Sequence, residues 1–195
     1  MLLLTALAND SSLSYMNPAQ DSARNDQQET ATTARRSTRW WLRTDSAEIV
    51  IAAPPEHVYA LISDMPRMGE WSPECAKVEW TGDNDGPAVG ATFVGHNVGG
   101  PKGLMKWSRT GTVRIATPGE EFAFSTAEGG QEGTVWRYEL AAVPGGTRVR
   151  ESYRVDRIPA WARIIDVPTN RARELREAME HTLLRLKDAA EASAR

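Results

Sequence analysis

The feature that most constrains this chain is a pair of alternating segments joined by a Pro-Gly-Gly turn, TVWRYELAAVPGGTRVRESYRV, residues 134–155. Alternation of apolar and polar residues places every second side chain on one face of a β-strand. One face of this predicted hairpin carries Trp136, Tyr138, Glu151 and Tyr153. A sealed core rarely combines a carboxylate with aromatic side chains that have polar tips, whereas a cavity that receives a ligand often does.

The same alternation recurs along the chain and predicts an antiparallel sheet. Turns rich in Gly, Pro, Asp and Asn separate the alternating segments, and short turns between consecutive strands indicate a meander. The glycines fall in these turns, and no phosphate-binding loop or dinucleotide fingerprint is found. The predicted strands lie near residues 45–52, 75–81, 90–98, 103–116, 120–127, 132–142 and 146–156.

Two short helices are predicted after the first strand, and a long helix after the last strand. Pro54 and Pro55 begin a first short helix, and a second one spans about Met65 to Trp71. A long helix over residues 171–192 carries a buried stripe of Leu175, Met179, Leu183 and Leu186. Because strands twist, a sheet of this length curls, and a long helix held in its concavity leaves room for a pocket.

In several short motifs, the chain resembles the START-like, helix-grip (SRPBCC) superfamily, in its polyketide cyclase/dehydrase and lipid-transport branch. The motifs are AAPPEHVYALISD, MGEWSPE, VGATFVGHN, WRYEL…GGTRVRESY and AMEHTLLRLKDAAEA, and the resemblance covers residues 45–192. It implies an α+β helix-grip fold, in which a curved antiparallel seven-stranded sheet wraps around a long C-terminal helix, with two short helices after strand 1. Members bind lipids, sterols, polyketides, plant hormones or quinones, and a minority catalyse cyclisation or dehydration, so the resemblance leaves the ligand open.

Face assignment by alternation predicts an aromatic lining with three polar groups, Asn97, Arg109 and Glu151. Arg109 is suited to a ligand carboxylate or to an internal ion pair with Glu151, and both readings stay open. In segment 103–116, Val113 and Ile115 are expected on the lined face. The resemblance makes Trp71 one wall of the cavity mouth, or else a structural plug. The predicted ligand-binding set is Trp71, Phe93, Asn97, Trp107, Arg109, Phe122, Phe124, Trp136, Tyr138, Glu151, Tyr153, Met179 and Leu183.

Three functions are compatible with this pattern. The first is a soluble carrier that binds a hydrophobic small molecule, a lipid or a polyketide-like compound. The second is a cyclase or dehydrase that uses Glu151, a weak catalytic candidate, or a tyrosine as acid or base. The third is a protein that binds another macromolecule. No nucleophile–base set, metal-ligand spacing or cofactor motif is found, so we expect no cofactor and no metal.

Composition limits the partners and the compartment. The formal net charge of −3 and the pI of about 5.7 argue against a nucleic-acid partner. The single cysteine, Cys75, excludes an internal disulfide and fits a reducing, cytoplasmic compartment. We interpret Cys75 as a small buried or edge residue. A monomer or a homodimer is expected.

The ends of the presumed domain are less constrained. Residues 1–43 are predicted to be a disordered tail, and residues 44–193 a ligand-binding domain. The tail ends in RRSTRWWLR, residues 35–43, which is either a small anchor for an anionic membrane or a protein, or a lead-in that covers an apolar patch. The first residues lack the positive region of a signal peptide, and Met16 is an alternative start to Met1. Segment 157–170 is either a lid or a connection.

Overall fold

The computed structural model describes residues 44–83, 86–99, 103–128, 131–156 and 171–194. It contains one antiparallel sheet of seven strands in the order β1-β7-β6-β5-β4-β3-β2, which confirms the predicted sheet. The strands are β1 (Thr44–Ile51), β2 (Cys75–Thr81), β3 (Thr92–Gly99), β4 (Met105–Thr117), β5 (Glu121–Glu128), β6 (Gln131–Val143) and β7 (Gly146–Val155).

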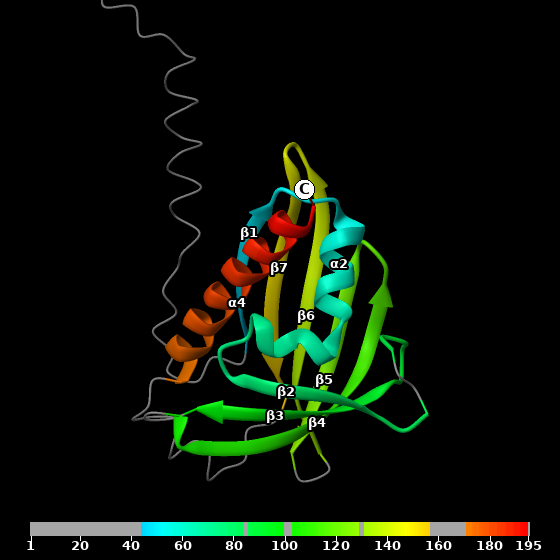
Figure 1. Ribbon diagram of the computed structural model, residues 1–195. Coiled ribbons are helices and arrows are strands. Elements are labelled where there is room, and N and C mark those ends of the chain that lie inside the picture. Colours follow the sequence, from blue (N-terminus) through cyan, green and yellow to red (C-terminus); the bar gives the residue numbers. More distant parts are fainter. Residues whose placement is uncertain (1–43, 84–85, 100–102, 129–130, 157–170, 195) are drawn as a thin grey trace, which may run out of the picture. The chain divides into compact units, whose positions relative to one another are not determined.

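The helices lie on one side of this sheet (Figure 1), which we call its inner face. They are α2 (Pro55–Ser63), the short 3-10 helix η1 (Met65–Glu70) and the long α4 (Arg171–Ser193). Helix α2 packs on β5, β6 and β7, η1 packs on β2, and α4 packs on β1 and β7. This arrangement is the helix-grip fold, and the element order is the predicted one.

An irregularity in the pairing of β4 with β5 corrects one predicted face. The pairing between β4 and β5 shifts between Val113 and Ile115, so that Val113 lies opposite Phe124 and Ile115 lies opposite Ala123. Such a bulge places one extra residue in a strand and reverses the alternation beyond it. Ile115 therefore lies on the face opposite to Val113, and the prediction that the two share the inner face was wrong.

Helix α4 is held against β1 by both apolar and charged side chains. The predicted stripe is confirmed at Met179, Leu183 and Leu186, which are fully buried. Near the start of the helix, Arg176 forms an ion pair with Asp45 of β1. Near its end, the Glu191 carboxylate accepts a hydrogen bond from the backbone N–H of Ala52 at 2.8 Å. Polar contacts at both ends therefore fix the helix along the first strand.

The turn between β6 and β7 requires its glycines. Gly145 and Gly146 have φ values of 91° and 146°, which other residues rarely adopt. A Cβ atom on Gly146 would lie 2.0 Å from the carbonyl oxygen of Ile51. The next residue, Thr147, donates its hydroxyl to the carbonyl of Ala53 at 2.7 Å. The turn thus packs tightly against the chain where β1 leads into α2.

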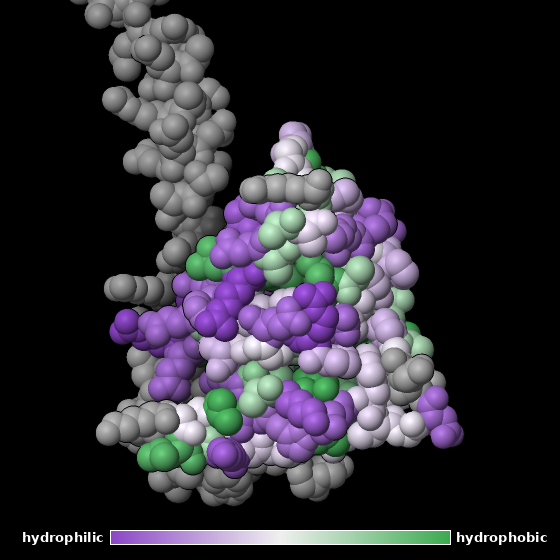
Figure 2. All heavy atoms as spheres, viewed as in Figure 1, coloured by the Kyte–Doolittle hydropathy of each residue, from purple (hydrophilic) through white to green (hydrophobic). Residues whose placement is uncertain are grey.

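Hydrophilic side chains predominate on the helix-covered side of the molecule, and hydrophobic ones form small separate groups (Figure 2). Within the part of the chain that the structure describes, no helix is long and apolar enough to cross a membrane. The predicted tail of residues 1–43 and the predicted lid or connection at 157–170 lie outside the described residues.

Candidate functional site

The centre of the inner face is a buried pair of polar side chains on the hairpin of β6 and β7. The register places Trp136 opposite Tyr153 and Tyr138 opposite Glu151, which confirms that the four share one face. The Tyr138 hydroxyl donates a hydrogen bond to Glu151 Oε1 at 2.9 Å. Tyr138 and Glu151 are each 3% exposed. The hairpin therefore brings a carboxyl group into the interior, where the phenol of Tyr138 is hydrogen-bonded to it.

Burial determines the protonation of this pair. Removal from water raises the pKa of Glu151 to about 8, and the hydrogen bond from Tyr138 opposes this rise only in part. Burial and the neighbouring carboxyl raise the pKa of Tyr138 well above its usual value. Glu151 is therefore mainly protonated at neutral pH, and Tyr138 is protonated throughout the physiological range.

One oxygen of the carboxyl group has no partner. Among the residues that the structure describes, Glu151 Oε2 is buried and makes no hydrogen bond. The internal ion pair between Arg109 and Glu151, one of the two readings open from the sequence, is thus not formed. A buried polar atom without a partner is rare in native proteins and calls for an explanation.

Aromatic rings surround the pair along the sheet. Phe124 contacts both Phe93 and Phe122, with ring centroids 5.4 and 6.1 Å apart. Trp136 lies against Tyr153 at 5.5 Å. A Cβ atom on Gly111 would lie only 2.1 Å from the Phe93 ring, so the glycine makes room for that ring. The predicted aromatic lining is therefore present on the inner face.

Residues of the helices cover this lining. Tyr59 of α2 packs edge-on against Phe122 at 6.2 Å. Met179 and Leu183 of α4 are buried in the interior. Trp71, at the end of η1, is 1% exposed, and the Arg67 guanidinium lies 5.3 Å from its ring centroid. Trp71 is thus part of the packed core, as expected for a structural plug.

The remaining predicted residues lie at a more accessible end of the inner face. Trp107 pairs with Asn97, and Arg109 pairs with Gly95, across β3 and β4. Asn97, Trp107 and Arg109 are all partly exposed, whereas Phe93 farther along β3 is buried. The side-chain amide of Asn97 donates a hydrogen bond to the backbone carbonyl of Gly95 at 3.4 Å. The lining therefore changes from partly exposed to fully buried along these strands.

Three residues next to the lining were not predicted as part of it. Tyr59 and Trp80 contact Phe122 and Phe93 respectively, and each stands at an apolar position of its helix or strand. Cys75 lies opposite Asn97 at the start of β2. Burial raises the pKa of its thiol to about 11, so it stays protonated and is a poor nucleophile. Cys75 is partly buried, in agreement with its interpretation as a small buried or edge residue.

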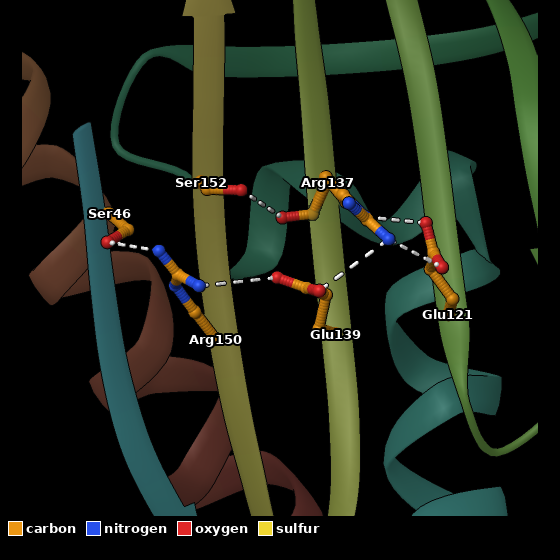
Figure 3. Close-up of polar contacts among 6 residues, drawn as sticks. All are labelled: Ser46, Glu121, Arg137, Glu139, Arg150 and Ser152. Atoms are coloured by element: carbon orange, nitrogen blue, oxygen red, sulfur yellow. Dashed lines mark hydrogen bonds and ion pairs between the residues drawn. The ribbon is translucent and has the colours of Figure 1, made fainter. Parts of the chain in front are cut away.

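Ion pairs lie on the outer face of β5, β6 and β7 (Figure 3). Arg137 donates to both carboxylate oxygens of Glu121 at 2.6 and 2.9 Å. Glu139 lies between Arg137 and Arg150, at 3.5 and 3.7 Å.

Within the described ranges, no group of three His, Cys, Asp or Glu side chains is arranged to hold a metal ion.

Fold and site together define a helix-grip protein whose inner face is aromatic and contains one buried carboxyl–phenol pair. Comparison with known families specifies the class further. Residues 44–191 match the family described as polyketide cyclase / dehydrase and lipid transport, and the chain belongs to this family.

Solved structures agree with the assignment. The polyketide-cyclase-like protein Cgl2372 from Corynebacterium glutamicum is 32% identical, with a TM-score of 0.51 over 77% of this chain and 92% of that chain. Protein CV1439 from Chromobacterium violaceum is 19% identical, with a TM-score of 0.55 over 77% of this chain and 99% of that one. The di-domain ARO/CYC protein StfQ of the steffimycin biosynthetic pathway shares the fold at 13% identity, with a TM-score of 0.62 over 93% of this chain and 62% of that chain. No curated protein matches the chain.

Proposed function

We propose that this protein binds and carries a hydrophobic small molecule, a lipid or a polyketide-like compound, on the inner face between the sheet and α4. The observation that carries the proposal is Glu151, a buried carboxyl group among aromatic side chains, one of whose oxygens has no hydrogen-bond partner in the described residues. A small-molecule site typically combines an apolar lining with a few placed polar groups. Membership of a family that includes lipid transport supports the same reading.

The partly exposed end of the inner face suits the entrance of such a site. Trp107 and Arg109 lie there, while Tyr138 and Glu151 lie in the buried part. In this arrangement the aromatic rings contact the apolar body of the ligand. Arg109 at the exposed end and Glu151 in the buried part contact its oxygen atoms. The predicted ligand-binding residues take these roles as part of the proposal.

Native mass spectrometry of the gently purified full chain, followed by solvent extraction, tests the proposal. We expect a stoichiometric hydrophobic adduct in the wild type and its loss in Trp136→Ala. Arg137→Ala is the matched control, because Arg137 is the next residue of β6 and lies on the outer face. An adduct retained equally in both variants, or a wild type that carries and takes up no apolar compound, contradicts the proposal.

A second candidate function is a cyclase or dehydrase in which Glu151 is the general acid. The observation that favours it is the pKa of about 8, which leaves the carboxyl protonated but able to release its proton near neutral pH. Glu151 would protonate a ligand oxygen, and the Tyr138 hydroxyl would stabilise the carboxylate that remains. Turnover of a poly-β-keto substrate should then disappear in Glu151→Gln and persist in Glu139→Gln. Turnover that persists in both variants removes Glu151 from the reaction.

The segment before the domain and the oligomeric state lead to two further predictions. The basic and aromatic residues 35–43 are proposed to contact an anionic membrane or a protein, and liposome co-sedimentation with and without residues 1–43 measures this. Equal pelleting of the two chains argues against an anchor.

Size-exclusion chromatography with light scattering distinguishes the expected monomer from a homodimer.

A further inference from the structure

The unpartnered oxygen of Glu151 indicates what the site recognises. The Tyr138 hydroxyl already donates a hydrogen bond to Oε1. Oε1 therefore acts as an acceptor, like the carbonyl oxygen of a carboxylic acid. A protonated carboxyl group has one O–H donor, and this leaves the proton on Oε2. Oε2 is the atom that has no partner among the described residues. The buried site therefore holds a hydrogen-bond donor without an acceptor.

Neighbouring side chains in the part of the chain that the structure describes do not supply that acceptor. Along β7, Glu151 lies between Val149 and Tyr153 on the inner face. The buried polar residue of α4 is Thr182, whose hydroxyl donates to the carbonyl of Ala178 at 2.9 Å. The ionisable groups near the pair are Tyr138 itself, the buried Tyr153 and Cys75, which acts on the charge of Tyr138. Tyr138 and Cys75 keep their protons at neutral pH, and no hydrogen bond joins Tyr153 to Glu151 Oε2. Among the described residues the donor on Oε2 thus has no acceptor, which a ligand in the interior would supply.

We propose that Glu151 is a specificity-determining donor, which selects ligands with an uncharged acceptor oxygen, such as a ketone or quinone carbonyl, over ligands of the same shape without one. The inference rests on the proposed binding function. A ligand carboxylate fits this position poorly, because it would bring a negative charge into an apolar interior beside the acid. Deprotonation of Glu151 replaces the donor by a second acceptor, so the selection also depends on pH.

Three probes that share one ring skeleton separate these statements: fluorene, 9-fluorenone and fluorene-9-carboxylate. Equilibrium dialysis of the full chain at pH 7 measures their affinities. We expect 9-fluorenone to bind about tenfold more tightly than fluorene, the gain of one hydrogen bond, and the carboxylate to bind more weakly than either. Infrared difference spectra should show the carbonyl stretch of bound 9-fluorenone at lower wavenumber than in an apolar solvent.

Two substitutions distinguish a donor from a merely structural role. Glu151→Gln keeps an acceptor for Tyr138 and a donor for the ligand, so it should retain the preference for 9-fluorenone and lose its pH dependence. Glu151→Met should lose the preference and the infrared shift while still binding fluorene. In the wild type the preference should decline between pH 7 and pH 9.5. Glu139→Gln, on the outer face of the same hairpin, should behave as the wild type.

The outcomes separate this inference from the proposed function. If fluorene binds and 9-fluorenone binds no better, or if the preference does not change with pH in the wild type, the donor role is overturned and the binding function stands. A preference retained in Glu151→Met also overturns it. If none of the three probes binds the wild type, the binding function fails and the inference fails with it. The pH response of the Gln variant decides the matter even if the Met variant does not fold.

Discussion

The two faces of the β6–β7 hairpin place glutamates of the same chain in opposite environments. On the outer face, Glu139 is partly exposed and lies near two arginines. On the inner face, Glu151 is buried, and among the described residues it has no arginine partner and takes one hydrogen bond, from Tyr138. Water screens the outer ion pairs and makes each of them weak. Exclusion of water makes the inner group costly to ionise, so the same side chain is a surface charge on one face and a neutral acid on the other.

The largest expected effect comes from removing the aromatic filling of the inner face. Phe122 is fully buried between Tyr59 and Phe124. Phe122→Ala should reduce the free energy of unfolding by roughly 3–5 kcal/mol, because the truncation leaves a cavity. Urea unfolding measures this, with Arg137→Ala as the outer-face control. A loss below about 1 kcal/mol would mean that the inner face is loosely packed around Phe122.

The next effect is the pH dependence that Glu151 imposes. Its pKa is raised by folding from an ordinary 4.5 to about 8, so the folded state binds the proton more tightly than the unfolded state. Stability from this group is complete below about pH 4.5 and is lost as the pH rises to 8. Between pH 5 and pH 8 the wild type should lose on the order of 3 kcal/mol relative to Glu151→Gln.

Urea unfolding of the wild type and Glu151→Gln at pH 5, 7 and 9 measures this difference. Glu139→Gln serves as the control on the outer face and should follow the wild type. Parallel pH profiles for the wild type and the Glu151 variant would show that Glu151 is ionised in the folded protein at pH 7.

A smaller effect is expected at Gly111, where the sheet accommodates the Phe93 ring. A Cβ atom there would approach the ring to 2.1 Å. Gly111→Ala should therefore cost about 1–3 kcal/mol through overpacking. Gly133→Ala is a suitable comparison, because its Cβ would meet only the carbonyl oxygen of Thr126 at 3.8 Å. Equal thermal unfolding midpoints for the two variants would show that Phe93 moves without cost.

The smallest effect belongs to the outer ion pairs. Glu121→Gln removes a carboxylate that accepts two hydrogen bonds from Arg137. The expected loss is about 0.2–1 kcal/mol, and it should shrink in 1 M salt because screening weakens exposed pairs. Chemical unfolding at low and high salt checks this. A larger loss that is insensitive to salt would remove the contrast between the two faces.

The sequence predicted the fold and the face assignments well, because both follow from local patterns. Alternation in β6 and β7 placed Trp136, Tyr138, Glu151 and Tyr153 together, and the helical spacing of Met179, Leu183 and Leu186 predicted the buried stripe. Alternation failed at Ile115, because a bulge reverses the face and has no clear signature in the residues themselves.

The chemistry of the site depends on three-dimensional burial, which alternation does not report. The sequence left open whether Glu151 pairs with Arg109 or meets a ligand. Arg109 lies on β4, opposite Gly95 of β3, while Glu151 lies on β7 opposite Tyr138. Two further strands, β5 and β6, separate β4 from β7 in the sheet, so proximity along one face did not imply contact.

The strand order has a consequence for how the chain is made. Strands β2 to β6 each pair with the next strand in the chain, but β1 pairs only with β7, so that Thr44 lies opposite Arg154. During synthesis the ribosome releases β1 long before its partner exists, whereas the later hairpins assemble from local contacts. Until translation nears its end, the apolar row of Ala47, Ile49 and Ile51 has neither β7 nor α4 to cover it. We therefore expect nascent chains that stop before β7 to aggregate or to depend on a chaperone.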